Sequence, residues 1–171
     1  MNKDYFDNSE QRCWEKLVDF QEHTHLFKAI TRCKKKNYAD ATGYTISKLG
    51  EKRKFNIELK IRNAALLKSG VFSADTFVDP ALFIESHKFC DLHFNNLLGY
   101  EGLYINFLDN NVTVIYHIEK ITVKPRIEKK KIPSKGYEGF EIGYRAFLHI
   151  KDAAIYKDYK LVKRIGEEWK N

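Results

Sequence analysis

The segment from Phe55 to Arg62 alternates apolar and polar residues without a break. In a β-strand, residues two apart lie on the same face, so the apolar residues can enter a core while Glu58, Lys60 and Arg62 project together from the opposite face. A carboxylate two residues from an ammonium can hold a divalent cation while the lysine polarises or deprotonates a water beside it. The segment therefore predicts an amphipathic strand that carries chemistry on its polar face.

An isolated acid precedes this strand. Residues 38–46 predict an earlier strand with Asp40 at its start, and a tight link containing Gly50 joins the two strands. Asp40 followed across a hairpin by Glu58-x-Lys60 resembles the signature of the PD-(D/E)XK nuclease superfamily, whose fold is restriction-endonuclease-like and Holliday-junction-resolvase-like. Ala39 stands where the proline of that pattern would be, a position at which the superfamily commonly accepts replacement.

The resemblance implies a fold, a reaction and a cofactor. The fold is α+β, with a mixed central sheet flanked by helices in the order αβββαβ. The reaction is metal-dependent hydrolysis of DNA phosphodiester bonds. Asp40 and Glu58 would hold Mg²⁺ or Mn²⁺, and Lys60 would orient or activate the attacking water. DNA is then the expected partner. Many relatives act as dimers, so a homodimer is a possible state, and a phage or mobile-element origin fits the same resemblance.

Two alternatives stay open at this point. One is a catalytically inactive module of the same fold that binds nucleic acid or protein, in which the acids persist as remnants. The other is an unrelated basic α+β protein in which Glu58, Lys60 and Arg62 form the solvent face of a strand and Asp40 is a turn residue. Metal binding separates the nuclease from both.

Further residues are candidates at the rim of this site. The superfamily often contributes a glutamate to the metal from its first helix, and Glu15 resembles that position best, with Glu10 and Glu22 as alternatives. Glu85 and Lys88, three apart, resemble a pair that edges the active site in several relatives. Lys88 is the only lysine or arginine between residues 72 and 119. Arg62 and Lys88 are therefore candidate nucleic-acid contacts, with plain surface exposure as the alternative for each.

The net charge of +7 is unevenly distributed along the chain. Residues 25–71 hold twelve basic and three acidic side chains, and 120–171 hold fourteen and seven, whereas 72–119 hold one and seven. The basic runs at 34–36, 52–54 and 129–131 can form a phosphate-binding rim. Lys129, Lys130 and Lys131 are candidate DNA contacts on this basis, although any single run is also explained as a solvated loop.

The rest of the pattern supplies the remaining elements. We expect a first helix capped by Ser9 and ending before residue 23, then a strand or helical turn at 26–31, and then the two strands of the hairpin. A loop around Gly70 leads to a second helix, which begins at Pro80 or at the cap Ser86 and runs to Gly99. Strands at 103–108 and 112–118 follow, then a projecting loop or ribbon at 124–135, and one or two strands at 140–155. These 171 residues predict a single domain, with a core at about 9–118 and a basic extension at 119–171.

Other classes of protein lack support in the sequence. No apolar run is long enough for a membrane span and the N-terminal residues do not resemble a signal peptide, so a cytoplasmic protein is expected. Cys13, Cys33 and Cys90 are too few and too widely spaced for a disulfide framework and are expected to be small core residues. The histidine spacings match no zinc signature, and a glycine-rich phosphate loop is absent from the sequence.

Overall fold

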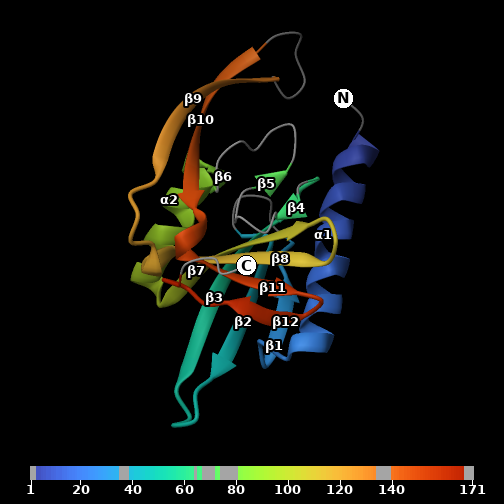
Figure 1. Cartoon of the computed structure of the whole chain (residues 1–171), viewed down its shortest axis with the longest axis vertical. Coiled ribbons are helices and arrows are strands. Elements are labelled where there is room, and N and C mark those ends of the chain that lie inside the picture. Colours follow the sequence, from blue (N-terminus) through green and yellow to red (C-terminus); the bar gives the residue numbers. More distant parts are fainter. Residues whose placement is uncertain are drawn as a thin grey trace.

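The computed structural model describes residues 3–34, 39–63, 65–66, 72–73, 81–133 and 140–167. A seven-stranded mixed sheet forms its centre, with helix α1 (Lys3–Thr24) on one face and helix α2 (Ser86–Phe94) on the other (Figure 1). In spatial order the strands are β1 (Ala29–Arg32), β2 (Ala41–Ile46), β3 (Lys52–Ile61), β7 (Tyr100–Leu108), β8 (Val112–His117), β11 (Ala153–Lys157) and β12 (Lys160–Lys163).

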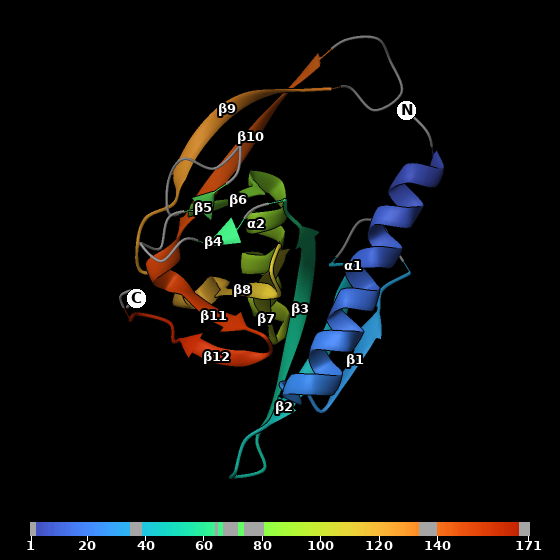
Figure 2. The ribbon, with the colours of Figure 1, turned by 45° about the vertical axis from the view of Figure 1, so that its right-hand side comes forward.

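A second sheet stands beside the first. It consists of β6 (Ala81–Glu85), β10 (Phe140–His149) and β9 (Arg126–Pro133), and its β9–β10 ribbon projects from the body of the molecule (Figure 2). The short strands β4 (Ala65–Leu66) and β5 (Phe72–Ser73) pair separately. Single 3-10 turns complete the described elements: η1 (Asn95–Leu98), η2 (Ile118–Lys120) and η3 (Ile150–Asp152).

Strand β3 lies at the middle of the architecture. It pairs antiparallel with β2 and parallel with β7, and the connection from β3 to β7 passes through β4, β5, β6 and α2. Helix α1, strands β1 to β3, helix α2 and strand β7 therefore follow the expected order αβββαβ, with small strands inserted before α2. The predicted fold class, α+β with a mixed sheet between helices, is confirmed.

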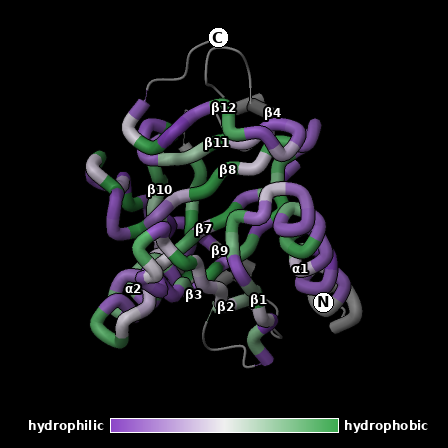
Figure 3. Tube along the Cα trace, turned by 90° about the horizontal axis from the view of Figure 1, so that it is seen from below, coloured by the Kyte–Doolittle hydropathy of each residue, from purple (hydrophilic) through white to green (hydrophobic). Residues whose placement is uncertain are grey.

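The two faces of β3 differ as the alternation predicts. Ile57 and Leu59 are buried against α1, in a cluster that includes Leu17 and Phe20 of that helix. The other side of the sheet packs under α2 and the second sheet, around Tyr104 and other fully buried residues. Figure 3 shows hydrophobic segments gathered on the central strands β7 and β8. Two cores thus cover both faces of the second half of β3, where Glu58 is buried and Lys60 half-buried, while Lys52, Arg53 and Lys54 at its start are exposed.

The segment after residue 119 belongs to this architecture. Strands β11 and β12 extend the central sheet, and Ala146, Leu148 and Ile155 are fully buried in the same cluster as Tyr104. The predicted hairpin at 103–118 is confirmed. Asn110 and Asn111 turn it with φ of 58° and 54°, which asparagine adopts more readily than most residues.

Both expected helix caps are wrong. Helix α1 begins at Lys3, so Ser9 lies inside it, and Ser86 is the first residue of α2 instead of its cap. Glu85 occupies the cap position without a capping side-chain bond, because its carboxylate is directed to Lys60. The strand expected at 26–31 is present as β1, slightly displaced. The loop around Gly70 and a start at Pro80 lie outside the described residues.

The cysteines are not uniformly core residues. Cys13 is buried, whereas Cys33 is half-buried and Cys90 is exposed on α2. Gly99 ends the second helical segment with φ of 78°, as a C-terminal glycine commonly does. Within the described parts of the chain, neither helix has the length and apolar character needed to cross a membrane.

Candidate active site

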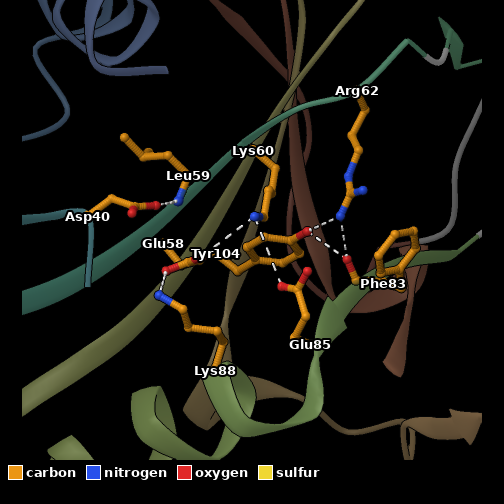
Figure 4. A network of polar contacts seen from close by, with 9 residues as sticks. All are labelled: Asp40, Glu58, Leu59, Lys60, Arg62, Phe83, Glu85, Lys88 and Tyr104. Carbon is orange, nitrogen blue, oxygen red and sulfur yellow. Dashed lines mark hydrogen bonds and ion pairs between the residues drawn. The ribbon is translucent and has the colours of Figure 1, made fainter. Parts of the chain in front are cut away.

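The polar face of β3 carries a buried carboxylate. Glu58 is only 2% exposed and lies beside Tyr104 of the neighbouring strand β7. Lys60, two residues on, projects from the same face and is half-buried. Glu58 and Lys60 thus share one face of the strand, with Nζ of Lys60 3.9 Å from Oε1 of Glu58 (Figure 4).

Asp40 reaches the same strand from the segment that leads into β2. Its Oδ2 accepts a hydrogen bond of 2.7 Å from the backbone N–H of Leu59, the residue between Glu58 and Lys60. Burial raises the pKa of the Asp40 carboxyl, and the Leu59 N–H and the nearby lysines offset only part of this effect. The hairpin acid is therefore fixed over the Glu-x-Lys segment.

Glu58 is surrounded by charges of both signs. Burial, and then the negative charge of Asp40, raise the pKa of Glu58 to about 7, although Lys88 and Lys60 both act to lower it. Nζ of Lys88, from α2, donates to Oε2 of Glu58 at 3.0 Å. Near neutral pH, Glu58 is thus poised between a protonated form and a carboxylate paired with cations.

Glu85 closes the site on the side of the second sheet. Its Oε2 lies 4.0 Å from Nζ of Lys60, so Lys60 stands between two carboxylates. Burial alone would raise the pKa of Glu85, but Lys60, its own backbone N–H and Arg62 lower it, and the net shift is downward. Glu85 is therefore an ionised partner of Lys60 at neutral pH.

Arg62 is anchored at the edge of the site. Its Nη2 donates to the carbonyl oxygen of Phe83 and to the hydroxyl of Tyr104, both at 2.8 Å. The Tyr104 hydroxyl donates in turn to the same carbonyl at 2.6 Å, and complete burial raises the pKa of Tyr104 to about 12. This network joins β3, β6 and β7, as Figure 4 shows.

The structure distinguishes between Glu10 and Glu15 of α1 as candidate residues of the site. Glu15 is exposed and accepts a hydrogen bond of 2.8 Å from Gln11 of its own helix. Glu10 is also exposed, but its charge acts on Asp40 and contributes to the raised pKa of that carboxyl after burial. Because Cys13 and Leu17 of α1 face the sheet, residue 10, one turn before Cys13, lies nearer the site than residue 15. Glu10 is accordingly the better candidate from this helix.

The expected basic rim is only partly assembled. Lys34 is exposed, and Lys35 and Lys36 lie outside the described residues. In the run at 52–54, Nζ of Lys52 lies 4.1 Å from the ring centroid of Tyr44, and Arg53 pairs with Glu101. This run lies at the start of β3, about 20–26 Å from Lys60 along the strand at roughly 3.3 Å per residue.

Strand alternation divides the run at 129–131. Lys130 lies on the face that carries Glu128, with which it pairs at 3.0 Å. Lys129 and Lys131 are opposite Tyr144 and Ile142 on the other face of the ribbon. The three lysines therefore do not form one surface.

A second group of ligand-type side chains, absent from the sequence-based candidates, lies near the start of β7. Nε2 of the buried His117 lies 2.6 Å from a carboxylate oxygen of Glu101 and 3.3 Å from one of Glu119. Arg53 also pairs with Glu101, and the N–H of Gly102 donates to both oxygens of Glu119. Existing protein partners thus engage both carboxylates of this group.

Comparison with known proteins adds little at the level of sequence. No family model and no curated protein match the chain. Among solved structures, it is similar to a Holliday junction resolvase from the archaeal hyperthermophile Archaeoglobus fulgidus, with 15% identity over 77% of this chain and 80% of that chain and a TM-score of 0.43. The function proposed below therefore rests on the geometry of Asp40, Glu58 and Lys60.

The side chains around β3 have a definite chemical capacity. The half-buried Asp40 and the buried Glu58 both have raised pKa values, and carboxylates in such surroundings suit a hard cation, whose charge would offset the repulsion between them. Lys60 and Lys88 supply positive charge to the same small volume. The arrangement suits a reaction in which negative charge develops on oxygen atoms.

Proposed function

We propose that this chain is a metal-dependent nuclease that hydrolyses phosphodiester bonds of DNA, with Mg²⁺ or Mn²⁺ as cofactor. One observation carries the proposal: Asp40 is bonded to the N–H of Leu59, directly between Glu58 and Lys60, on the buried strand β3. The negative charge of Asp40 also acts on Glu58, where it adds to the effect of burial in raising the pKa of that carboxyl. The geometry thus supports a joint role for the three side chains.

Asp40 and Glu58 are the proposed metal ligands, with Glu10 as a further ligand or outer contact. Carboxylate oxygens are the donors that Mg²⁺ and Mn²⁺ prefer, and few protein ligands leave room for waters and phosphate. A cation bound there would supply Lewis-acid charge at the scissile phosphate. The raised pKa of Glu58, caused by burial and by Asp40, means that this carboxyl must lose its proton before it serves as a ligand.

Lys60 is the proposed activator of the nucleophile. Its ammonium stands between Glu58 and Glu85, so it is held in place while its remaining N–H donors can orient a water. The same charge stabilises negative charge that develops on the phosphate oxygens. Glu85 holds Lys60 by charge from the side away from Glu58.

The decisive experiment is a metal titration followed by thermal melting. In wild type, Mg²⁺ or Mn²⁺ should raise the melting temperature, because binding to the folded state adds RT ln(1 + [L]/Kd) to the free energy of unfolding, where [L] is the free metal concentration and Kd its dissociation constant. Asp40→Asn removes the repulsion with Glu58, so it should melt higher than wild type without metal and respond little to it. His117→Ala, which disrupts the other ligand-type group, should keep the wild-type response.

Two outcomes would overturn this assignment. A wild type without a metal response and a less stable Asp40→Asn would make Asp40 a structural hydrogen-bond acceptor for Leu59. A response lost in His117→Ala and kept in Asp40→Asn would move the metal to the group around Glu101.

The ion pair between Lys88 and Glu58 favours a second candidate function. An ammonium 3.0 Å from the central carboxylate can replace the metal in charge, as expected of a DNA-binding module of the same fold without turnover. Incubation of duplex, single-stranded and branched DNA with Mn²⁺ decides between the two. Cleavage that Asp40→Asn abolishes supports the nuclease, and DNA binding without cleavage or metal binding supports the inactive module.

A further inference from the structure

The face of the second sheet that adjoins Lys60 carries an ordered set of side chains. Directly opposed residues of antiparallel strands share a face. The register places Glu85, Arg145 and Glu128 in one line across the three strands, and Phe83, Phe147 and Arg126 in the next. Because the carboxylate of Glu85 approaches Lys60 to 4.0 Å, this face begins at the candidate active site and continues onto the projecting ribbon.

Three guanidinium groups stack on the rings of this face. Cζ of Arg62 lies 4.0 Å and Cζ of Arg145 4.1 Å from the ring centroid of Phe83. Cζ of Arg126 lies 4.8 Å from the centroid of Phe147. These five residues are called the arginine–phenylalanine row. Stacking engages the flat face of a guanidinium and leaves its in-plane N–H donors for hydrogen bonds, the geometry that suits bidentate contact with phosphate.

Positive charge gathers on this side of the second sheet. Among the side chains that the structure describes, Arg62, Arg126, Arg145 and Lys130 lie here together with two acids, Glu85 and Glu128. Glu85 is already engaged with Lys60. Nε of Arg145 is buried and has no hydrogen-bond partner among the described residues, a state that costs free energy. The side chain of Arg126 pairs with Glu128 at 3.1 Å and is 54% exposed, so a phosphate group can reach it from solvent.

We propose that the arginine–phenylalanine row binds the phosphodiester backbone of the DNA as it continues past the cleavage site. The position of that site rests on the proposed function, whereas binding by the row does not require cleavage. The row spans two strand spacings, about 10 Å. At about 3.4 Å of rise per nucleotide of duplex DNA, it covers roughly three nucleotides on one flank.

The chemistry of the row favours phosphate contact over base recognition. The ring of Phe83 is 8% exposed and lies under two guanidinium groups, so it is not available for stacking on a base. Stacked arginines that present N–H edges contact phosphates without reading sequence. The row should therefore strengthen binding equally for all sequences.

The edge of the central sheet provides a matched control. Arg126→Gln/Arg145→Gln removes two charges from the row, and Lys157→Gln/Lys160→Gln removes two exposed charges from strands β11 and β12, which belong to the other sheet. Binding of fluorescein-labelled duplex DNA is measured by anisotropy in EDTA over a range of salt concentrations. The row variant should bind at least tenfold more weakly at low salt, and its salt slope should fall by about 1.8, since each lost phosphate contact removes about 0.9. The control should keep the wild-type slope.

Equal losses in the two double variants, or an unchanged slope in the row variant, would overturn the proposal. Arg126→Gln alone, at an exposed position, gives a second test that does not depend on packing around Phe83, and its expected fall in slope is about 0.9. The readout in EDTA is independent of catalysis. If the protein binds DNA through the row but cleaves none, the inference about the row stands and the proposed nuclease function is wrong. If the protein cleaves DNA while the row variants bind DNA as tightly as wild type, the proposed function stands and the inference about the row is wrong.

Discussion

The ammonium of Lys88 donates to the carboxylate of Glu58 at 3.0 Å, although Lys88 belongs to α2 and Glu58 to the central strand β3. Glu58 is almost fully buried, so this pair is only weakly screened by water. A divalent cation that binds Glu58 must compete with this ammonium. The pair therefore links the position of α2 to the charge state of the candidate active site.

Replacement of Lys88 should change metal affinity. In Lys88→Met the competing charge is absent, and the pKa of Glu58 should rise because Lys88 lowers it in wild type. On the alkaline plateau of each protein, where affinity no longer changes with pH, Mn²⁺ should bind about tenfold more tightly to the variant, a change of about 1.4 kcal/mol. Isothermal titration of wild type and variant measures this. Lys157→Met, at an exposed position on β11, makes the same side-chain change and should leave affinity unaltered. Weaker binding in Lys88→Met would mean that Lys88 supports the metal site.

Glu58 should make stability depend on pH. Burial and Asp40 raise its pKa to about 7 from an ordinary value of 4.5, so the folded state holds a proton that the unfolded state releases. This contribution to stability is fully present below pH 4.5 and is lost as pH rises through 7. Urea unfolding in EDTA should show the stability of wild type falling relative to Glu58→Gln between pH 5 and 8. A constant difference would contradict the raised pKa.

Metal binding should depend on pH in the opposite direction. The ligand form of Glu58 is the carboxylate, so each proton that remains bound competes with the cation. Apparent Mn²⁺ affinity should rise about tenfold per pH unit below 7 and level off above it, because one proton is released per cation bound. Titration in buffers of different ionisation enthalpy counts that proton. Affinity that is flat from pH 5.5 to 7 would exclude Glu58 as a ligand.

The sequence predicts the centre of this site better than its surroundings. Unbroken alternation at 55–62 predicts strand β3 and its division into two faces, because side-chain direction in a strand follows from position alone. The hairpin then brings Asp40 to Leu59. By contrast, the burial of Glu58 depends on how α2 and the second sheet cover β3, a packing that no local pattern encodes.

The difference between local pattern and tertiary packing also explains the other features that the sequence did not predict correctly. His117 meets Glu101 and Glu119 only through the pairing of β7 with β8 and the turn η2, so no spacing rule could have found the group. The run at 129–131 appears uniform as sequence, yet a strand directs alternate lysines to opposite faces. Ser9 resembles a helix cap in isolation, but residues 3–8 continue the helix before it.

Lys60 should be needed for catalysis and not for metal binding. Lys60→Ala removes the group proposed to orient water and to stabilise charge on the phosphate oxygens, so cleavage should fall about a hundredfold or more. Single-turnover cleavage with saturating Mn²⁺ measures the rate, and calorimetry checks that metal still binds. Unchanged cleavage would remove Lys60 from the mechanism.

The Tyr104 hydroxyl should contribute both to the stability of the fold and to the position of the Arg62 side chain. Tyr104→Phe deletes a buried hydroxyl that donates to the carbonyl of Phe83 and accepts from Arg62, so the free energy of unfolding should fall by about 1–2 kcal/mol. Tyr116→Phe is the matched control, because its buried hydroxyl also makes backbone hydrogen bonds, donating to the carbonyl of Leu148 and bonding with the backbone of Leu82.

The two tyrosine variants should lose similar stability and differ in DNA binding. Without the Tyr104 hydroxyl, Arg62 loses one of the acceptors that fix its guanidinium over Phe83. Affinity for duplex DNA in EDTA should therefore fall a few-fold in Tyr104→Phe and stay at the wild-type value in Tyr116→Phe. Anisotropy titrations at equal salt, well below both melting temperatures, make the comparison. Equal affinities in the two variants would show that Arg62 needs no anchoring by Tyr104, since Phe83 alone would then hold the guanidinium in place.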